Sequence, residues 1–365
     1  MIFTCSRAAL SEAANHVSRV VPAKSTYPAL MGILLVAGQG KVTLSGYDLE
    51  MGITTSIDAN VEQPGKVVLD ARLFCDIVRR LPEDRVNVNV NERHLCQITS
   101  GKSLFSLVGI NGDEFPELPD VQNGQPISLP APLLDSMVRQ TIYATGDPNG
   151  SRPVLAGIKV EVSDGEIRMI AVDGARLAVR CEKIDTAQEM TFVVPGKTFA
   201  EVVKLMKEDE NVLMSVSPRQ IVFSVNGYSV VSRLLEGEFI NYKRTIPPTT
   251  GTKVVANTAD MIDVIERISQ VIVERLRTPV TCRFEEGLFK AACTTERGNA
   301  QDELPVKLEG ENINIGCNSR FLLEALRAAE TDEVEISMSG PLSPIIIRPT
   351  QGESFLFIVL PVRIK

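Results

Sequence analysis

The stretch ALMGILL at residues 29–35 returns as VLAGIKV at residues 154–160, a displacement of 125 residues (154 − 29). The stretch DLEMGI, which begins at Asp48, returns as DGARLAV beginning at Asp173, and its displacement is also 125 (173 − 48). Two separate matches therefore share one offset. Repeats of about 20 to 50 residues build solenoids, whereas a unit of about 120 residues can close its own hydrophobic core. The sequence thus predicts similar domains in a row.

A third copy is fainter but keeps nearly the same spacing. The apolar helical pattern LDARLFCDIVRRL contains Phe74, VPGKTFAEVVKLM contains Phe199, and NSRFLLEALRAA contains Phe321. These phenylalanines are displaced by 125 and then by 122 residues (199 − 74; 321 − 199). We therefore expect three domains of one design.

Each copy has one order of elements: a helix, short strands, a second helix and more strands. Turn glycines between the first two strands, Gly40, Gly165 and Gly287, keep the offsets of 125 and 122. The predicted fold is α+β, with two helices packed on an antiparallel sheet in each domain. The six predicted helices are Ser6–Val20, Asp70–Arg80, Pro130–Ala144, Gly196–Lys207, Ala259–Val271 and Ser319–Ala328.

Two polar, proline-rich stretches separate the copies. FPELPDVQNGQP begins at Phe115 and FINYKRTIPPTTGT begins at Phe239, 124 residues later (239 − 115). Such composition is typical of exposed linkers between domains. We therefore expect domains at residues 1–122, 123–249 and 250–365.

The overall composition is that of an ordinary globular protein, with 44% hydrophobic and 23% charged residues among 365. No run of 18 apolar residues is present, and the N-terminal MIFTCSRAAL lacks the basic segment and apolar core of a signal peptide. The seven cysteines are odd in number and lie in apolar contexts, as expected of reduced thiols. We therefore expect a cytoplasmic protein without a membrane partner.

A net charge of −8 and a pI near 5.1 argue against a conventional nucleic-acid binder. Contact with nucleic acid would need basic residues concentrated on one surface. Residues 6–24 carry a surplus of two basic side chains, and residues 70–80 and 196–208 carry a surplus of one each. The helix that contains Asp260 has no such surplus. Each of these charges, taken singly, also fits a solvated helix face.

Residues suited to catalysis are scarce. The chain has two histidines, His16 and His94, and neither lies near a CxxC or HExxH pattern. There is no GxxxxGK phosphate loop, no GxGxxG after a strand and no GxSxG elbow. The repeated Asp48 and Asp173 are interpreted as turn or helix-cap residues rather than catalytic carboxylates. The sequence therefore predicts no catalytic residue, no metal and no cofactor.

Several features together resemble the bacterial beta sliding clamp family, the processivity subunits of replicative DNA polymerase. They are the three two-helix repeats, the DLEM and DGARLAV strands, FPEL before a linker, and the terminal FIVLPVRIK. The resemblance spans essentially the whole chain. It implies three DNA-clamp domains per chain and a ring formed as a head-to-tail homodimer, which encircles duplex DNA with its helices lining the hole.

The helix count is compatible with such a ring. Twelve helices, at about 8 to 10 Å between neighbouring axes, trace a circle of roughly 30 to 38 Å diameter. Subtracting about 10 Å for helix thickness leaves a hole of roughly 20 to 30 Å, into which a duplex fits loosely. Such a surface would contact phosphates diffusely, without reading bases.

The resemblance also implies a pocket between the second and third domains. DNA polymerases, the clamp loader and repair proteins would insert a short hydrophobic motif there, with Arg176 and Arg363 holding carbonyls or acids at the rim. Relatives commonly have Pro in place of Ile240, and Met in place of Leu360 or Val362. On pattern alone, the aliphatic residues would be read as core. The pocket residues carried over by motif are Leu155, Val172, Gly174, Arg176, Leu177, Ile240, Thr245, Leu342, Pro344, Leu360, Pro361, Val362 and Arg363.

Two further sites follow from the resemblance. It implies a dimer seam in which an edge strand with Phe105 and Leu107 meets Val271 and Ile272 of a second copy. The DNA contacts that it implies are Lys24, Arg72, Asn149, Arg152 and Lys197.

We therefore expect a DNA sliding clamp that acts by topology, tethers replication and repair proteins, and is not an enzyme. An interaction scaffold that does not encircle DNA is the first alternative. An enzyme with an unrecognised site is a second, more remote alternative.

Overall fold

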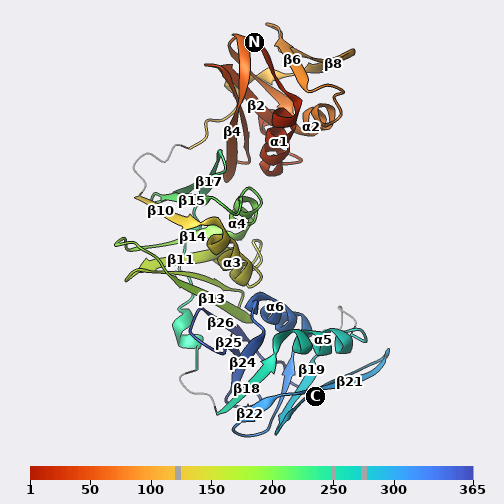
Figure 1. Cartoon of the computed structure of the whole chain (residues 1–365), viewed down its shortest axis with the longest axis vertical. Coiled ribbons are helices and arrows are strands. Elements are labelled where there is room, and N and C mark those ends of the chain that lie inside the picture. Colours follow the sequence, from red (N-terminus) through yellow and green to blue (C-terminus); the bar gives the residue numbers. More distant parts are fainter. Residues whose placement is uncertain (120–124, 248–250, 273–277, 365) are drawn as a thin grey trace. The chain divides into compact units, whose positions relative to one another are not determined.

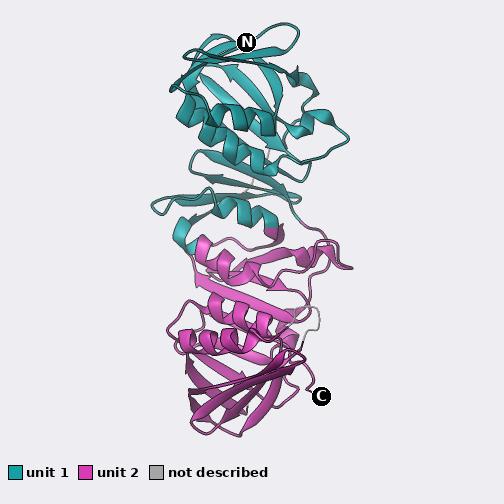
Figure 2. Cartoon of the chain, turned by 90° about the vertical axis from the view of Figure 1, so that its right-hand side faces the viewer, with its two compact units in different colours: residues 1–134, 197–234 teal, residues 135–196, 235–365 magenta. Residues whose placement is uncertain are grey.

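The computed structural model describes residues 1–119, 125–247, 251–272 and 278–364 (Figure 1). The expected domain boundaries, at residues 122–123 and 249–250, lie outside the described residues. Internal contacts divide the chain into two compact units, which Figure 2 colours separately. Unit 1 consists of residues 1–134 and 197–234, and unit 2 of residues 135–196 and 235–365.

All six predicted helices are present in the described residues. Helix α1 is followed by a 3-10 turn, η1 (Ser18–Val20), which accounts for the expected end at Val20. Helix α4 ends four residues before the expected Lys207, where the N–H of Leu205 donates instead to Val202 O in a tighter turn. The helices are α1 (Arg7–Val17), α2 (Ala71–Arg79), α3 (Ala131–Ile142), α4 (Gly196–Val203), α5 (Thr258–Ser269) and α6 (Ser319–Ala329).

Polar side chains at the ends of strands fix where four helices start. One of them is Ser6, which accepts a hydrogen bond from the N–H of Ala9 in α1. Asp70 accepts a hydrogen bond from the N–H of Leu73 at 2.8 Å, and Asn257 accepts one from Asp260 at 3.0 Å. Asn318 caps α6 in the same way. Each cap pairs an N–H that the helix itself leaves unpaired, which stabilises the fold by about 1 kcal/mol.

Unit 1 contains one antiparallel sheet of 13 strands among its described residues. Its main path runs β10-β15-β16-β17-β4-β1-β6-β7-β8; β3 joins at β4 and is followed outward by β2, β5 and β9. The strands are β1 (Ile2–Ser6), β2 (Gly32–Gly38), β3 (Lys41–Tyr47), β4 (Met51–Gln63), β5 (Gly65–Asp70), β6 (Arg85–Val90), β7 (Leu95–Ser100), β8 (Ser103–Val108), β9 (Ile110–Asn111), β10 (Gln125–Pro130), β15 (Asn211–Val216), β16 (Gln220–Val225) and β17 (Tyr228–Arg233).

Unit 2 contains two antiparallel sheets, of nine and four described strands, in the orders β14-β11-β12-β13-β26-β25-β24-β18-β22 and β21-β20-β19-β23. Helix α6 contacts β25 and β26, and α5 contacts β20 and β21 (Figure 1). The strands are β11 (Gly157–Ser163), β12 (Glu166–Val172), β13 (Arg176–Lys183), β14 (Met190–Pro195), β18 (Thr252–Asn257), β19 (Val280–Glu285), β20 (Leu288–Thr295), β21 (Gly298–Pro305), β22 (Lys307–Glu309), β23 (Ile313–Cys317), β24 (Glu333–Met338), β25 (Ile345–Pro349) and β26 (Phe355–Val359).

The three copies share one hairpin turn, which follows β3, β12 and β20. One side chain in each turn accepts a hydrogen bond from a backbone N–H two or three residues later: Asp48 at 2.6 Å, Asp173 at 3.0 Å and Thr295 at 3.1 Å. These positions are displaced by 125 and 122 residues (173 − 48; 295 − 173). The interpretation of Asp48 and Asp173 as turn residues is therefore confirmed.

The junctions between copies are strand pairs of one kind. In unit 1, β4 pairs with β17 so that Met51 lies opposite Ser232. In unit 2, β13 pairs with β26 so that Arg176 lies opposite Val359. The paired positions are displaced by 125 and 127 residues (176 − 51; 359 − 232), so one pairing is used twice. Across the described residues, no helix is long and apolar enough to cross a membrane.

Candidate functional site

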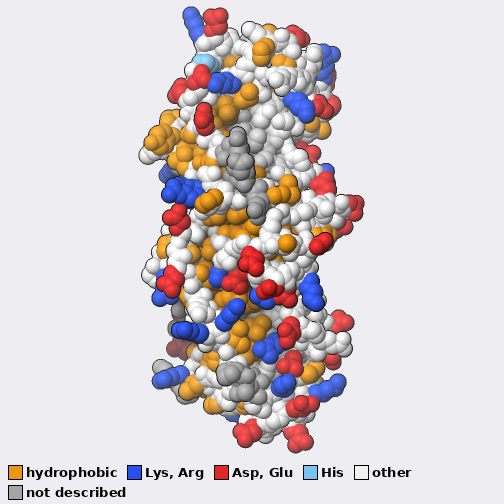
Figure 3. Space-filling view, turned by 90° about the vertical axis from the view of Figure 1, so that its left-hand side faces the viewer, with side chains coloured by type: hydrophobic (Ala, Val, Ile, Leu, Met, Phe, Trp, Pro, Cys, Tyr) orange, Lys and Arg blue, Asp and Glu red, His pale blue; other side chains and the backbone are white. Residues whose placement is uncertain are grey.

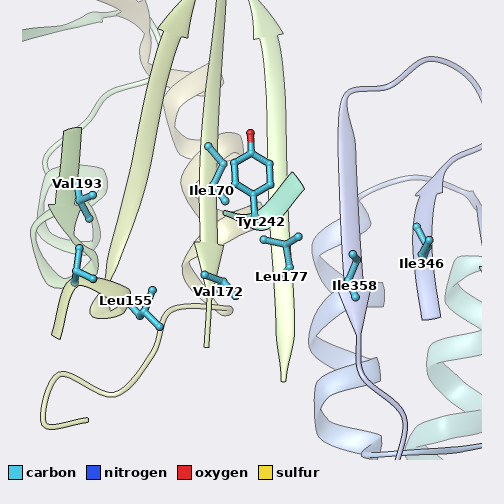
Figure 4. Packing of buried hydrophobic residues seen from close by; sticks show 9 residues of the cluster. Leu155, Ile170, Val172, Leu177, Val193, Tyr242, Ile346 and Ile358 are labelled. Carbon is cyan, nitrogen blue, oxygen red and sulfur yellow. The ribbon is translucent and has the colours of Figure 1, made fainter. Parts of the chain in front are cut away.

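A cluster of buried hydrophobic residues lies on the nine-stranded sheet of unit 2 (Figure 4). It contains no residue of a described α-helix. Its residues come from β12, β13, β14, β25 and β26 and from two 3-10 turns, η4 (Pro153–Ala156) and η5 (Tyr242–Thr245). The nine members are Val154, Leu155, Ile170, Val172, Leu177, Val193, Tyr242, Ile346 and Ile358.

Strand register decides which side chains gather here. Leu177 of β13 lies directly opposite Ile358 of β26, and Val179 lies opposite Leu356. Because side chains alternate between the two faces of a strand, these four residues share one face. Arg176 therefore points to the opposite face, on which α6 packs.

The segment that contains η5 crosses this face and is held by one tyrosine. The Tyr242 hydroxyl donates to Glu161 Oε2 at 3.0 Å, and the residue is 5% exposed. Two residues earlier, Ile240 packs against the same cluster. At the end of η5, Thr245 Oγ1 donates to Tyr242 O at 2.6 Å. Tyr242 thus sets the position of Ile240 and Thr245 relative to the sheet.

The Tyr242–Glu161 hydrogen bond has a defined protonation state. Burial, and then the Glu161 carboxylate, raises the pKa of Tyr242 above its usual value, so the phenol stays protonated and donates. Burial opposes ionisation of Glu161, but hydrogen bonds from Lys159 and Tyr242 outweigh it and hold the pKa of Glu161 below its usual value. Glu161 is therefore an ionised acceptor at neutral pH.

A cavity of about 510 Å³ opens beside the cluster. Val154, Phe239 and Ile240 form its apolar wall, and Glu236, Glu238 and Arg152 add charges. Arg152, expected as a DNA contact, therefore shares a cavity with the pocket residue Ile240.

Four expected pocket residues belong to the cluster or pack against it: Leu155, Val172, Leu177 and Ile240. Three others are exposed and apolar, Leu342 at 65%, Leu360 at 40% and Val362 at 36%. Pro344 and Pro361 are half-buried, while Gly174, Thr245 and Arg363 are exposed. The resemblance did not supply the members Val154, Ile170, Val193, Tyr242, Ile346 and Ile358; strand alternation from Val172, Leu177 and Leu360 would have found Ile170 and Ile358.

The C-terminal tail is held to the sheets by backbone hydrogen bonds. The N–H of Leu360 donates to Ala175 O at 2.8 Å, and the N–H of Val362 donates to Gly316 O at 2.8 Å. A Cβ at Gly316 would collide with the carbonyl oxygen of Val362, so only glycine allows the tail to lie this close. Leu360 thus stands two residues beyond the cluster member Ile358.

Arg176 is not free at a rim, which corrects the role expected for it. Its side chain is 8% exposed, Nε donates to Asp173 Oδ2 at 2.8 Å, and Nη1 pairs with Glu324 of α6. Its guanidinium lies 4.4 Å from the centroid of the Phe321 ring. Two carboxylates and two aromatic rings, Phe321 and the more distant Tyr143 at 5.7 Å, therefore already hold this cation, and it joins β13 to α6.

The expected DNA contacts are exposed, but one of them is paired. Lys24, Arg72 and Asn149 are exposed, and Lys197 Nζ lies 2.6 Å from Glu50 Oε2 and 3.3 Å from Asp48 Oδ2. Partial burial works against its charge, but these carboxylates, Glu50 above all, raise the pKa of Lys197. Any phosphate would compete with them for Lys197.

The expected seam residues differ in exposure. Phe105 in the edge strand β8 is 37% exposed, whereas Leu107 is buried at 8% inside its own unit, so Leu107 is not an exposed apolar contact. Val271 and Ile272 are half-buried at the end of α5, where Thr295 Oγ1 donates to Val271 O at 2.8 Å. That bond brings the end of α5 to the turn before β21.

No group of His, Cys, Asp and Glu side chains suited to a metal ion occurs in the part of the chain that the structure describes. The described cysteines, all seven, are free thiols, and burial raises the pKa of Cys5 and Cys96 to about 12. The site offers hydrophobic surface and hydrogen bonds, which suit binding.

Comparisons with known proteins agree along the whole chain. Models of the DNA polymerase III beta subunit match in order: its N-terminal domain at residues 1–119, its central domain at 128–241 and its C-terminal domain at 243–363. The beta sliding clamp of Bacillus subtilis is 30% identical, with all of both chains covered.

Solved structures give the same result. The DNA polymerase sliding clamp from Bacillus subtilis has a TM-score of 0.97 and 31% identity, covering all of both chains. A sliding clamp from Bartonella birtlesii, bound to griselimycin, has a TM-score of 0.93 and 30% identity over all of both chains.

Replacing Arg176 by methionine should reduce the free energy of unfolding by about 1 to 3 kcal/mol, because the partly buried carboxylates of Asp173 and Glu324 would lose their hydrogen-bond donor. Arg320→Met is a matched control: Arg320 also pairs with Glu324, at 3.7 Å, and lies 5.4 Å from the Phe321 ring, but its side chain is 68% exposed. The control should cost roughly 0.5 kcal/mol or less. Urea unfolding measures both, and equal losses would contradict the assignment.

Proposed function

The chain belongs to the DNA polymerase III beta subunit family, the beta sliding clamps, and we propose that it acts as a homodimeric ring whose second junction binds partner motifs. It is a DNA sliding clamp, a processivity factor of DNA replication and not an enzyme. Its partners are DNA and DNA polymerase. We assign three domains, at residues 1–122, 123–249 and 250–365. We also propose that the protein acts in the cytoplasm.

The proposal of a ring rests on the strand pairing that occurs in the same way at both junctions of the chain. Strand β21 begins at Gly298, 122 residues after Arg176 of β13, and β8 begins at Ser103, 125 residues before Tyr228 of β17 (298 − 176; 228 − 103). In the described residues, β8 and β21 each pair on one side only. Open strand edges are templates for pairing. We infer that β8 of one copy pairs with β21 of another.

The repeat predicts the register of this third junction. In the first junction Met51 lies opposite Ser232, and Arg176 takes the place of Met51 in the second. The repeat offsets carry Arg176 forward to Gly298 and Ser232 back to Leu107. Gly298 would therefore lie opposite Leu107 of the second copy. Phe105 would then lie opposite Ala300. The half-buried Val271 and Ile272 lie beside this edge through the Thr295 hydrogen bond. Two such junctions close a head-to-tail dimer.

Inside the ring, DNA contact is assigned to Lys24, Arg72, Asn149, Arg152 and Lys197. These side chains are exposed, and they would touch phosphates without reading bases. The chain's net charge of −8 would keep the rest of the surface away from DNA.

The hydrophobic cluster of unit 2, with the exposed Leu342, Leu360 and Val362, is assigned as the pocket for partner motifs. Support comes from its apolar side chains beside a cavity of about 510 Å³ and from polar groups at the edge, as in other peptide sites. DNA polymerase, the clamp loader and repair proteins would share this pocket through short hydrophobic motifs.

Topological binding separates a clamp from a scaffold that does not encircle DNA. The protein loaded on circular DNA should remain bound through gel filtration, and linearising the DNA with one restriction cut should release it, because a ring slides off a free end. Retention on linear DNA would refute the ring, and blocking both ends with bound protein should restore retention.

The seam is tested by charge. The wild-type chain should sediment at twice its 39.8 kDa, whereas Phe105→Asp and Ile272→Asp should yield monomers, because each buries a carboxylate at the junction. Val36→Asp is the control, since Val36 is 38% exposed in β2, nearly the same as Phe105. Dimers that persist in both seam variants would contradict the assignment of these residues to the dimer interface.

The pocket is tested with griselimycin, which is bound to the Bartonella birtlesii clamp. Deleting residues 360–365, or replacing Leu360 by Asp, should weaken calorimetric binding at least about tenfold, because an apolar wall is lost. Ile364→Asp is the control: Ile364 is 42% exposed on the same tail but lies against Gly316. Unchanged affinity in the deletion, with the dimer intact, would disprove this pocket.

A further inference from the structure

The sheet face that carries the hydrophobic cluster changes character along its strands. In β12, Val172 and Ile170 belong to the cluster, whereas Arg168 and Glu166 on the same face line a second cavity, of about 900 Å³. In β13, Leu177 belongs to the cluster and Lys183 lines the second cavity. We call this cavity the charged groove. Figure 3 shows hydrophobic and charged side chains side by side on the surface that faces the viewer.

The charged groove is continuous with the proposed pocket. Tyr242 belongs to the cluster and also lines the groove. Val179, Ile246 and Leu356 pack against the cluster and line the groove as well. From Val172 to Arg168 is four residues of strand, or about 13 Å, which about four residues of extended peptide can span. A chain seated in the pocket can therefore enter the groove.

The cations of the groove outnumber the carboxylates left to pair them. Glu166 pairs with Arg168 at 2.5 Å, Glu182 with Arg180 at 2.5 Å, and Glu335 lies 4.0 Å from Lys253. No ion pair within the described residues involves the remaining basic residues, Lys183, Lys243 and Arg348; the fourth carboxylate of the lining is Glu353. The lining thus holds four cations and four carboxylates, but three of the carboxylates are already paired, two of them with cations outside the lining, and the three unpaired cations favour an anionic occupant.

We propose that the charged groove binds an acidic segment of the partner protein, joined to the hydrophobic motif by about four residues. The proposal rests on the assignment of the pocket and deepens it. The pocket holds the apolar anchor, and Lys183, Lys243 and Arg348 hold carboxylates that flank it. Continuity through Tyr242 makes one chain the occupant of both, and the charge balance makes its flank acidic.

The test compares labelled peptides that share one Leu-Phe anchor. Three glutamates lie four residues before the anchor in one peptide and four residues after it in another, and glutamines replace them in the matched pair. At low salt, one glutamate peptide should bind roughly tenfold more tightly than its glutamine counterpart, since exposed charge pairs each contribute little but three add together. The advantage should shrink as salt rises.

Serine substitutions at Lys183, Lys243 and Arg348 together should abolish the glutamate advantage and leave the glutamine peptides unchanged. A matched control variant replaces the exposed Lys41, Arg93 and Lys307 by serine, which removes the same charge from elsewhere on the surface. This variant should still bind the glutamate peptide more tightly than the glutamine peptide. Equal affinity for glutamate and glutamine peptides, or an advantage that survives the groove substitutions, would overturn the groove while leaving the pocket. If no peptide binds, the pocket assignment itself fails.

Discussion

The pairing of strand edges is the constraint on which the rest of this structure depends. A strand edge carries backbone N–H and C=O groups that must be paired, and each copy of the repeat presents two such edges, one on its hairpin and one on its last strand. At β4–β17 and β13–β26 the hairpin edge of one copy meets the last strand of the next in one register. This joins the copies by main-chain hydrogen bonds and, among the described strands, leaves β8 and β21 paired on one side only.

The same pairing separates two tasks at the second junction. Because neighbours on a strand point to opposite faces, Leu177 faces the hydrophobic cluster, and Arg176 faces α6, where Asp173 and Glu324 hold it. Arg176 thus stabilises the junction on one face of the sheet, and the other face is the one that we assign to partner binding. The hydrogen bond from Tyr242 to Glu161 then fixes the linker on that second face.

Much of the fold could be predicted from the sequence, because a pattern found in one copy of the repeat can be checked at the equivalent positions of the other copies. The offsets of 125 and 122 identified the second helix of each copy, the turn glycines and the roles of Asp48 and Asp173, and helical periodicity supplied the other three helices; all of these are local features. The pairing of Arg176 with Glu324 and of Lys197 with Glu50 could not be predicted, since these carboxylates are far away in sequence and carry no local signal. The resemblance named pocket residues, but only the register could tell which of them share a face.

The first junction has the same pairing, but its side chains fill the place that corresponds to the proposed pocket. Tyr47 and Leu30 stand 125 residues before Val172 and Leu155 and are buried in a similar cluster (172 − 47; 155 − 30). Gly52 replaces Leu177, and Leu118 fills the space above it so closely that a Cβ there would lie 2.6 Å from the Leu118 side chain. A partner's apolar anchor would have to displace the Leu118 side chain and the Tyr47 ring, which already pack together there. The repeat has two equivalent junctions, and the side chains of the first occupy the place that we assign to a partner motif in the second.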